Sequence, residues 1–221
     1  MSRTLYLGTS DFAAEVLRTL ARSPHRPVLV VTPPDRPRGR GRRLQSPPAA
    51  FAARELGFDV LQSANVSEAD SITRIRAANP DVGAVCAFGQ LIREPLLSEP
   101  PMLNVHPSLL PRWRGAAPIE RAMISGDEIT GVSIMRLTEG LDAGPVALQE
   151  EVAIGPREDF GELSARLAAA GGRLLVEALD RHASGRLELR EQDEGAATYA
   201  EKIEAGDRRL SPQAPASIFS A

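Results

Sequence analysis

Cysteine, lysine and aromatic residues are scarce in this chain of 221 residues. The single cysteine, Cys86, excludes an internal disulfide and argues against a cysteine-based metal site. It lies in the apolar run VGAVCAF, so we interpret it as a small core residue rather than a nucleophile. Lys202 is the only lysine, and arginine therefore carries the rest of the positive charge.

Long apolar segments are also missing from the chain. No apolar run approaches the ~20 residues that span a bilayer, and the N-terminal MSRTLYLGTS has no signal-peptide core. We therefore expect a cytoplasmic protein with no membrane partner. The net charge of −3 gives no global basicity that would indicate a nucleic-acid partner. The length suits one α/β domain, or one domain and the start of a second.

The first half of the chain alternates apolar runs with segments of helical periodicity. The apolar runs predict strands or extended pieces at residues 4–8, 27–32, 58–61, 82–88 and 102–106. Helices are expected at residues 12–21, 48–56 (with Ser46 as its cap) and 67–78. Strands separated by helices indicate βαβ units, so the predicted fold class is α/β with a doubly wound, mostly parallel sheet.

The pattern changes after residue 118. A helix is expected at residues 118–124, followed by strands at 130–137 and 146–152 around a turn. Such a pair predicts antiparallel additions at the sheet edge. Residues 159–182 predict a long helix with Phe160, Leu163 and Leu167 among its inward side chains, which Gly171 and Gly172 could bend.

The turn after the first strand, GTSDFAAEVL, lacks the G-x-G-x-x-G pattern of dinucleotide-binding folds. Only Gly8 stands where three glycines are needed to approach a pyrophosphate. A nicotinamide-dependent dehydrogenase is therefore a remote alternative.

Residues 103–122, LNVHPSLLPRWRGAAPIERA, place Asn104 and His106 at the end of a buried strand. Two residues apart on a strand, these side chains point to the same side. Together they could stabilise an oxyanion and move a proton in acyl transfer. The structural alternative is an asparagine that satisfies a turn and a histidine bonded in the core. We interpret Trp113 as a packing anchor, with stacking on a base or substrate as the alternative.

A carboxylate lies in the loop LTEGLDAGPV, between Gly140 and Gly144. Asp142 could orient a histidine or accept a proton from an amine. Glu139 is close by, and the sequence does not decide which of the two carboxylates turns inward. The structural alternative is a solvated loop residue.

A cationic segment, residues 33–48, follows the second predicted strand. Its arginines, opposed by Asp35, are Arg36, Arg38, Arg40, Arg42 and Arg43. With prolines and glycines between them, they predict a mobile cationic loop on the carboxyl edge of the sheet. Its functional interpretation is phosphate contact with a nucleic acid. The alternative is a solvated surface loop.

Together these motifs resemble the methionyl-tRNA formyltransferases from about Leu5 to Leu210. The most specific part is NVHPSLLPRWRGAAPI, reinforced by TPPDRPRGRGRRLQSP, CAFGQLI, TGVSIMRLTEGLDAG and TYAEKI. The SLLP motif with its preceding Asn-x-His is shared by folate-dependent formyltransferases, whereas the arginine segment and RGAAPI favour the tRNA-specific branch. The resemblance implies a Rossmann-like fold. Gln90 and Arg93 depart from the more apolar residues common in the family.

The resemblance implies transfer of a formyl group from N10-formyltetrahydrofolate to the α-amine of methionyl initiator tRNA. It assigns catalysis to Asn104, His106 and Asp142. Folate-binding residues would be Phe88, Gly89, Gln90 and Leu91 for the pterin, and Ser108, Leu109, Leu110 and Pro111 lining the folate site. The tRNA acceptor end would meet Arg36, Arg38, Arg40, Arg42 and Arg43, with Arg40 weighted most. No metal is expected, and we expect a monomer.

The resemblance also implies a domain boundary. Residues 1–205 would form the catalytic domain, and residues 206–221 would begin a linker to a C-terminal β-barrel domain that this chain lacks. Two alternatives stay open. One is a folate-dependent formyltransferase acting on an amino sugar or a ribonucleotide. The other is a truncated folate- or RNA-binding module without turnover.

Overall fold

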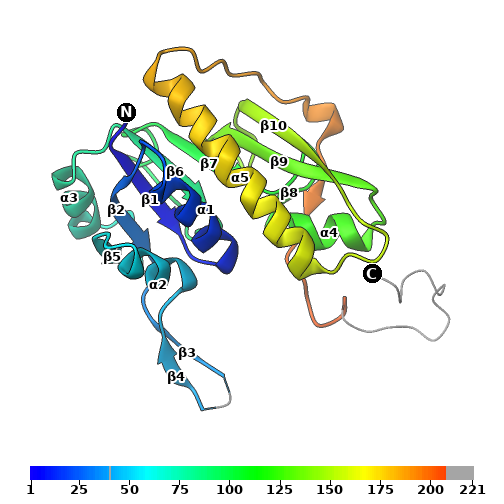
Figure 1. Ribbon diagram of the computed structural model, residues 1–221, viewed down its shortest axis with the longest axis horizontal. Coiled ribbons are helices and arrows are strands. Elements are labelled where there is room, and N and C mark those ends of the chain that lie inside the picture. Colours follow the sequence, from blue (N-terminus) through cyan, green and yellow to red (C-terminus); the bar gives the residue numbers. More distant parts are fainter. Residues whose placement is uncertain (40, 208–221) are drawn as a thin grey trace.

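The computed structural model describes residues 1–39 and 41–207; Arg40 and residues 208–221, most of the expected linker, lie outside the described residues. Within the described part, a seven-stranded sheet has the order β10-β9-β7-β6-β1-β2-β5 (Figure 1). Its strands are β1 (Thr4–Gly8), β2 (Pro27–Thr32), β5 (Val60–Gln62), β6 (Val82–Cys86), β7 (Met102–His106), β9 (Ile129–Arg136) and β10 (Val146–Ala153). The helices are α1 (Asp11–Ala21), α2 (Pro48–Glu55), α3 (Ala69–Ala77), α4 (Pro118–Ile124) and α5 (Phe160–Ala183).

The pairing of the strands confirms the predicted fold class. Strands β5, β2, β1, β6 and β7 run parallel, and β9 and β10 extend the sheet antiparallel beyond β7. The chain is thus a Rossmann-like, mostly parallel α/β fold with antiparallel edge additions. Two small pairings lie outside this sheet: β3 (Arg36–Arg38) with β4 (Arg43–Gln45), and β8 (Arg114–Gly115) with β11 (Tyr199–Ala200).

Side chains of alternate strand residues pack into two separate hydrophobic cores, one on each face of the sheet. Tyr6 of β1 joins the larger core, which α1, α2 and α5 cover. Its neighbours Leu5 and Leu7 point to the opposite face and pack with Ile75 of α3. Both faces of the central parallel strands are therefore buried, as strands of a parallel sheet usually are. Within the described residues, no helix combines the length and the apolar character needed to cross a membrane.

Helix α5 runs without interruption through the two glycines expected to bend it. A Cβ atom at Gly171 would lie 2.8 Å from Val105, and one at Gly172 would lie 2.7 Å from Thr19. These glycines therefore let α5 approach the sheet and α1 closely. Phe160, expected inside, is instead 47% exposed at the first turn.

Several element ends differ from expectation for local reasons. The expected cap Ser46 does not cap α2, whose N-cap is Pro47, because the Ser46 hydroxyl donates to Asp35. Strand β6 ends at Cys86 rather than residue 88, since Ala87 has a positive φ of 42°. Helix α3 begins at Ala69, two residues later than expected.

The cationic segment is a hairpin rather than an irregular loop. Strands β3 and β4 pair antiparallel from Arg36, opposite Gln45, to Arg38, opposite Arg43. Hydrogen bonds to Asp35 from Ser46 and Gln62 fix the base of the hairpin against the sheet. The hairpin projects from the carboxyl end of β2, away from the body of the molecule (Figure 1).

Candidate active site

Strand β7 delivers Asn104 and His106 to the carboxyl edge of the sheet. Both lie between β6 and β9 and are nearly buried, with 8% and 4% of their surface exposed. The intervening Val105 packs into the larger core on the other face. Side chains two residues apart on this strand therefore point to the same side, as expected, so the amide and the imidazole lie together.

Asp142, in the loop between β9 and β10, completes a three-residue group. Its Oδ2 lies 3.6 Å from Nδ1 of His106, and its Oδ1 lies 3.5 Å from Nδ2 of Asn104. The backbone N–H of Gly115 donates to Asp142 Oδ2 at 2.9 Å. Glu139 is exposed, so Asp142 is the carboxylate that turns inward. The structure thus brings together the three residues expected to act in catalysis.

The second ring nitrogen of His106 is held by the backbone. Its Nε2 lies 2.8 Å from the carbonyl oxygen of Trp113, and since a carbonyl only accepts, Nε2 carries the proton. Nδ1 is left facing Asp142 at a separation longer than a direct hydrogen bond. An amide donor, an imidazole and a carboxylate therefore converge on one point. Such a set can stabilise an oxyanion and accept a proton.

Trp113 is anchored as a structural residue. Its indole N–H donates to Asp127 at 2.8 Å, and Arg112 forms two further hydrogen bonds to the same carboxylate. The Arg112 guanidinium also lies over the indole ring, 4.4 Å from its centroid. Burial would raise the pKa of Asp127, but the hydrogen bonds from Arg112 and Trp113 outweigh it and hold this pKa below its ordinary value. Trp113 therefore presents its carbonyl to His106 from a fixed position.

Arg114 and Gln192 belong to the surroundings of the site, although the sequence analysis identifies neither. Arg114 is 1% exposed and hydrogen-bonds to Gln192 and Glu194. Gln192 in turn donates to the carbonyl of Asp142 at 2.9 Å. The sequence does show Arg114 next to Trp113. Because an arginine is almost never fully buried without a paired charge, a buried Arg114 would need an acidic partner elsewhere in the chain. Its partners Gln192 and Glu194 lie in a polar segment, and from the sequence alone this segment looks like the start of a linker rather than part of a site.

The expected pterin-binding residues follow β6, the neighbour of β7. Phe88 is buried, and its carbonyl accepts from Thr9 at 2.6 Å. The Gln90 amide is engaged within the protein, since it donates to Ser63 and accepts from the backbone of Val66. Leu91 is 66% exposed. Their contact with a pterin stays a prediction.

The expected folate-lining residues form the turn after β7. The Ser108 hydroxyl is buried and donates to the Arg112 carbonyl at 2.6 Å. Leu110 packs with Met135 and Val146, and Leu109 lies close against Gly131. Pro111 is partly buried. These side chains shape the loop beside His106, and their contact with folate likewise stays a prediction.

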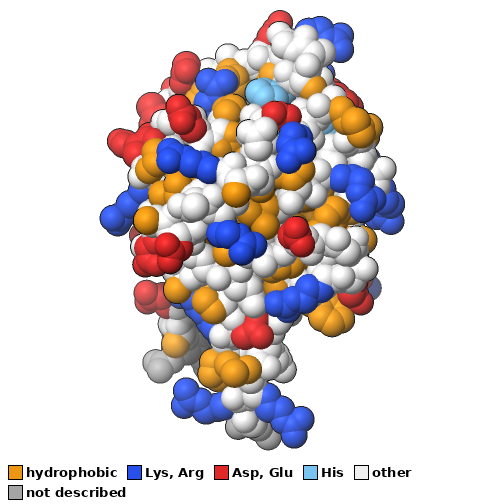
Figure 2. All heavy atoms as spheres, turned by 90° about the vertical axis from the view of Figure 1, so that its left-hand side faces the viewer, with side chains coloured by type: hydrophobic (Ala, Val, Ile, Leu, Met, Phe, Trp, Pro, Cys, Tyr) orange, Lys and Arg blue, Asp and Glu red, His pale blue; other side chains and the backbone are white. Residues whose placement is uncertain are grey.

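The hairpin begins at the carboxyl end of β2, on the same edge of the sheet as His106. Strand β2 lies three positions from β7, roughly 14 Å along the sheet. Arg36, Arg42 and Arg43 are exposed, whereas Arg40 and the side chain of Arg38 lie outside what the structure describes. Figure 2 shows basic side chains (blue) on either side of the narrow end of the molecule, where the hairpin projects.

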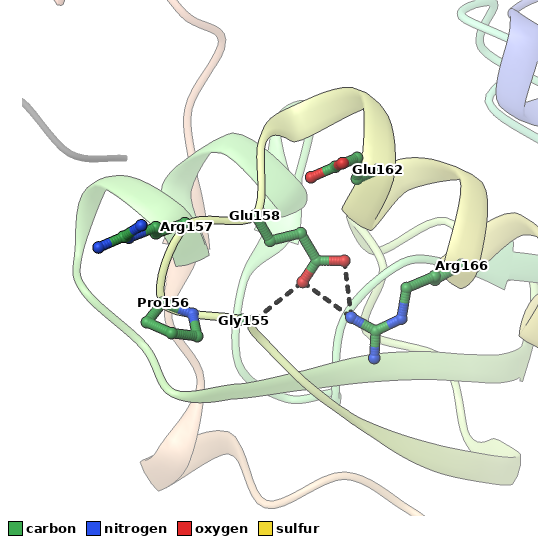
Figure 3. Close-up of a pocket in the computed structure, with 6 residues that line it drawn as sticks. All are labelled: Gly155, Pro156, Arg157, Glu158, Glu162 and Arg166. Carbon is green, nitrogen blue, oxygen red and sulfur yellow. Dashed lines mark hydrogen bonds and ion pairs between the residues drawn. The ribbon is translucent and has the colours of Figure 1, made fainter.

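A surface hollow between β10 and α5 is separate from this group. Figure 3 shows it lined by Gly155, Pro156, Arg157, Glu158, Glu162 and Arg166. The Glu158 carboxylate accepts from Gly155 N and from Arg166, so these charges satisfy one another. Among residues 1–39 and 41–207, no three histidine, cysteine or acidic side chains cluster as metal ligands would. The candidate active site therefore rests on Asn104, His106 and Asp142.

Comparison with known proteins places the chain in a class of enzymes. Residues 2–179 match the formyl transferase family, and the chain belongs to it. Glycinamide ribonucleotide transformylase 1 from Symbiobacterium toebii is similar in structure, with a TM-score of 0.70 and 25% identity, and covers 87% of this chain and 95% of its own. HypX from Aquifex aeolicus, solved in complex with tetrahydrofolic acid, shares the fold alone (TM-score 0.70, 17% identity, 98% of this chain and 33% of its own).

Within this class, the chain belongs to the methionyl-tRNA formyltransferases. That of Chloroflexus aggregans is 41% identical over 98% of this chain and 71% of its own length. That of Methylococcus capsulatus is 43% identical, over 99% and 71%. That of Halorhodospira halophila is 44% identical, over 97% and 70%. The predicted family is thereby confirmed, and the chain spans about 70% of the length of these curated relatives.

Proposed function

We propose that this chain transfers a formyl group from N10-formyltetrahydrofolate to the α-amine of methionyl initiator tRNA. The observation that carries the proposal is the convergence of Asn104, His106 and Asp142 at the carboxyl end of β7. Ligands of open α/β sheets bind at this edge. Membership of the methionyl-tRNA formyltransferases supports the choice of both substrates.

The geometry supports a two-step addition and elimination. The methionyl amine attacks the formyl carbon, and the carbonyl oxygen becomes an oxyanion that the Asn104 amide and the protonated Nδ1 of His106 stabilise. Asp142 orients the imidazolium and accepts the proton that the amine loses. The bond between the formyl carbon and N10 then breaks, N10 takes a proton from His106, and tetrahydrofolate leaves. No step requires a metal ion.

The segment after β6 suits the bicyclic ring of a folate through its backbone. Within the described residues, the backbone N–H and C=O groups of Gly89, Gln90 and Leu91 make no hydrogen bonds to other protein groups. Backbone polar groups near a binding site need a partner from water or from a ligand. A pterin offers hydrogen-bond donors and acceptors with which such unpaired backbone groups can pair. The proposal therefore assigns pterin contact to the backbone here, with Ser108–Pro111 beside it as the second wall.

The arginine hairpin favours a nucleic-acid acceptor over an amino sugar or a free ribonucleotide. Arginine forms paired, charge-assisted hydrogen bonds with phosphate, and a hairpin that projects beyond the body can reach phosphates several nucleotides from the amine. The proposal includes Arg36, Arg38, Arg40, Arg42 and Arg43 in this contact. It also includes a catalytic unit of residues 1–205, a monomeric state and the cytoplasm as the place of action.

A formylation assay tests the proposal. The chain is incubated with N10-formyltetrahydrofolate and methionyl initiator tRNA, and N-formylmethionyl-tRNA is measured beside sugar-nucleotide and ribonucleotide amines as acceptors. We expect transfer to the charged tRNA. Transfer to a small amine alone would favour the second class of formyltransferase. Folate binding in a calorimeter without any transfer would indicate a binding module.

A further inference from the structure

A buried arginine, Arg114, precedes Gly115, whose N–H binds Asp142 of the candidate active site. The Arg114 side chain is 1% exposed, the largest of the fully buried side chains among the described residues. Its Nε and one terminal nitrogen donate to Oε1 of Gln192 at 3.0 and 2.9 Å. Two more hydrogen bonds, of 2.8 and 2.7 Å, go to Glu194. The charge of Arg114 is therefore paired, and its fork fixes the orientation of the Gln192 amide.

That orientation leaves the Gln192 N–H groups aimed at the loop that carries Asp142. Nε2 of Gln192 donates to the backbone carbonyl of Asp142 at 2.9 Å and to that of Gly144 at 2.6 Å. Every hydrogen-bonding capacity of this amide nitrogen is thus used. Asp142 has a positive φ of 46°, a conformation that needs external support in a residue with a side chain.

The carboxylate of Asp142 is held by Gly115, which is itself paired to residues near Gln192 in the chain. Gly115 N–H donates to Asp142 Oδ2. The backbone around Gly115 is fixed by pairing of β8 with β11, in which Arg114 N donates to Thr198 O and Ala116 N donates to Ala200 O, both at 2.8 Å. The backbone and the carboxylate of Asp142 are therefore both tied to residues 192–200, which lie beyond the matched family region of residues 2–179.

We propose that Gln192, oriented by Arg114, is a positioning residue that holds Asp142 at its working distance from His106 and Asn104. The inference rests on the proposed function of Asp142 in formyl transfer. A displacement of about 1 Å in such a group can cost on the order of a hundredfold in rate. Gln192 touches no reacting atom, and its effect passes through the Asp142 backbone.

The variant Gln192→Glu tests this role. A glutamate keeps an oxygen for Arg114 but replaces the two N–H donors with an acceptor that faces two carbonyls. We expect kcat for formyl transfer to fall about 10- to 100-fold, while KM for N10-formyltetrahydrofolate changes less than about twofold. The matched control is Glu191→Gln, which exchanges a carboxylate and an amide at the exposed neighbouring position. This variant should keep the wild-type kcat. Gln192→Met repeats the test without added charge if the glutamate variant fails to fold.

Amide hydrogen exchange supplies a readout that does not depend on turnover. We expect residues 138–146 to exchange faster in Gln192→Glu and Gln192→Met than in wild type, and Glu191→Gln to match wild type. A wild-type kcat and unchanged exchange in both Gln192 variants would overturn the inference, as would equal losses in kcat and folate affinity. A wild-type chain without transfer would refute the proposed function, while faster exchange would still establish the hold on Asp142.

Discussion

His106 donates its Nε2 proton to the backbone carbonyl of Trp113 at 2.8 Å, and this bond decides which ring nitrogen of the imidazole is available for chemistry. With Nε2 occupied, Nδ1 is the nitrogen that gains or loses a proton, and it faces Asp142 Oδ2 at 3.6 Å. The Trp113 carbonyl and Asp142 therefore face the two nitrogens of the ring and fix its orientation.

Replacing the amide of Asn104 tests its proposed role as an oxyanion donor. In Asn104→Ala, we expect kcat for formyl transfer to fall on the order of 10²–10³-fold, the usual cost of losing one such donor. Folate affinity, measured by calorimetry, should change little, because the amide acts mainly on charge that develops during reaction. Near-normal turnover in a folded Asn104→Ala protein would exclude this role.

Asp127 links loop stability to pH through Arg112 and Trp113. Its pKa lies below the ordinary value of 3.8, so its ionised form stabilises the folded state. This contribution is complete above that ordinary value, which the unfolded chain retains, and it is lost as pH falls through the lower folded value. We expect Asp127→Asn to reduce the free energy of unfolding by about 1 kcal/mol at pH 7, since Arg112 is half exposed.

Urea unfolding of wild type and Asp127→Asn from pH 7 down to pH 3 checks this expectation. The difference between the two proteins should stay constant to about pH 5 and shrink below about pH 4. A difference that is the same across the whole range would contradict the assignment. Because Asp127 fixes Trp113, and Trp113 fixes His106, kcat at pH 7 should fall as well.

Gly115 cannot accept a side chain without moving strand β11. Its φ is +117°, and a Cβ atom there would lie 2.9 Å from the Ala200 carbonyl oxygen. We expect Gly115→Ala to displace the N–H that binds Asp142 and to lower kcat at least about tenfold. Gly57→Ala is the matched control, because Gly57 also has a positive φ, of 74°, but a Cβ atom there meets nothing within 4 Å. It should lose about 1 kcal/mol of stability and keep full activity.

The salt dependence of tRNA binding tests the arginine hairpin. Each phosphate that a variant no longer neutralises should make the slope of log K against log salt shallower by roughly 0.7–0.9. We expect Arg42→Gln and Arg43→Gln to weaken tRNA binding and to flatten this slope, with folate affinity unchanged. Arg173→Gln on α5, which breaks an exposed ion pair with Glu150, serves as the control. Equal slopes for all of these proteins would remove the hairpin from the interface.

Much of the fold follows from local patterns in the sequence. The apolar runs at β1, β2 and β7 predict their strands with the observed bounds, because a strand buried on both faces is apolar throughout. The period of two likewise predicts that Asn104 and His106 share a side. These inferences need only the residues of the element itself.

The remaining features depend on contacts between distant segments. The sequence does not decide between Asp142 and Glu139, because the inward turn of Asp142 depends on the N–H of Gly115, 27 residues away. Gln192 reaches Asp142 across 50 residues, and no local pattern marks such a contact. The hairpin is not predicted because its strands are short and arginine-rich, and its base is fixed by Asp35, Ser46 and Gln62 rather than by an apolar face.

Cys86 should be inert in the native protein, as its interpretation as a core residue predicts. It is fully buried beside Tyr6, and burial raises the pKa of its thiol to about 12. At pH 8 the reactive thiolate is then on the order of one part in ten thousand. We expect no labelling by a disulfide reagent in buffer and one thiol per chain in concentrated urea. Native labelling at the rate of a free thiol would mean that the core beneath α1 opens readily, or that Cys86 is poised for chemistry.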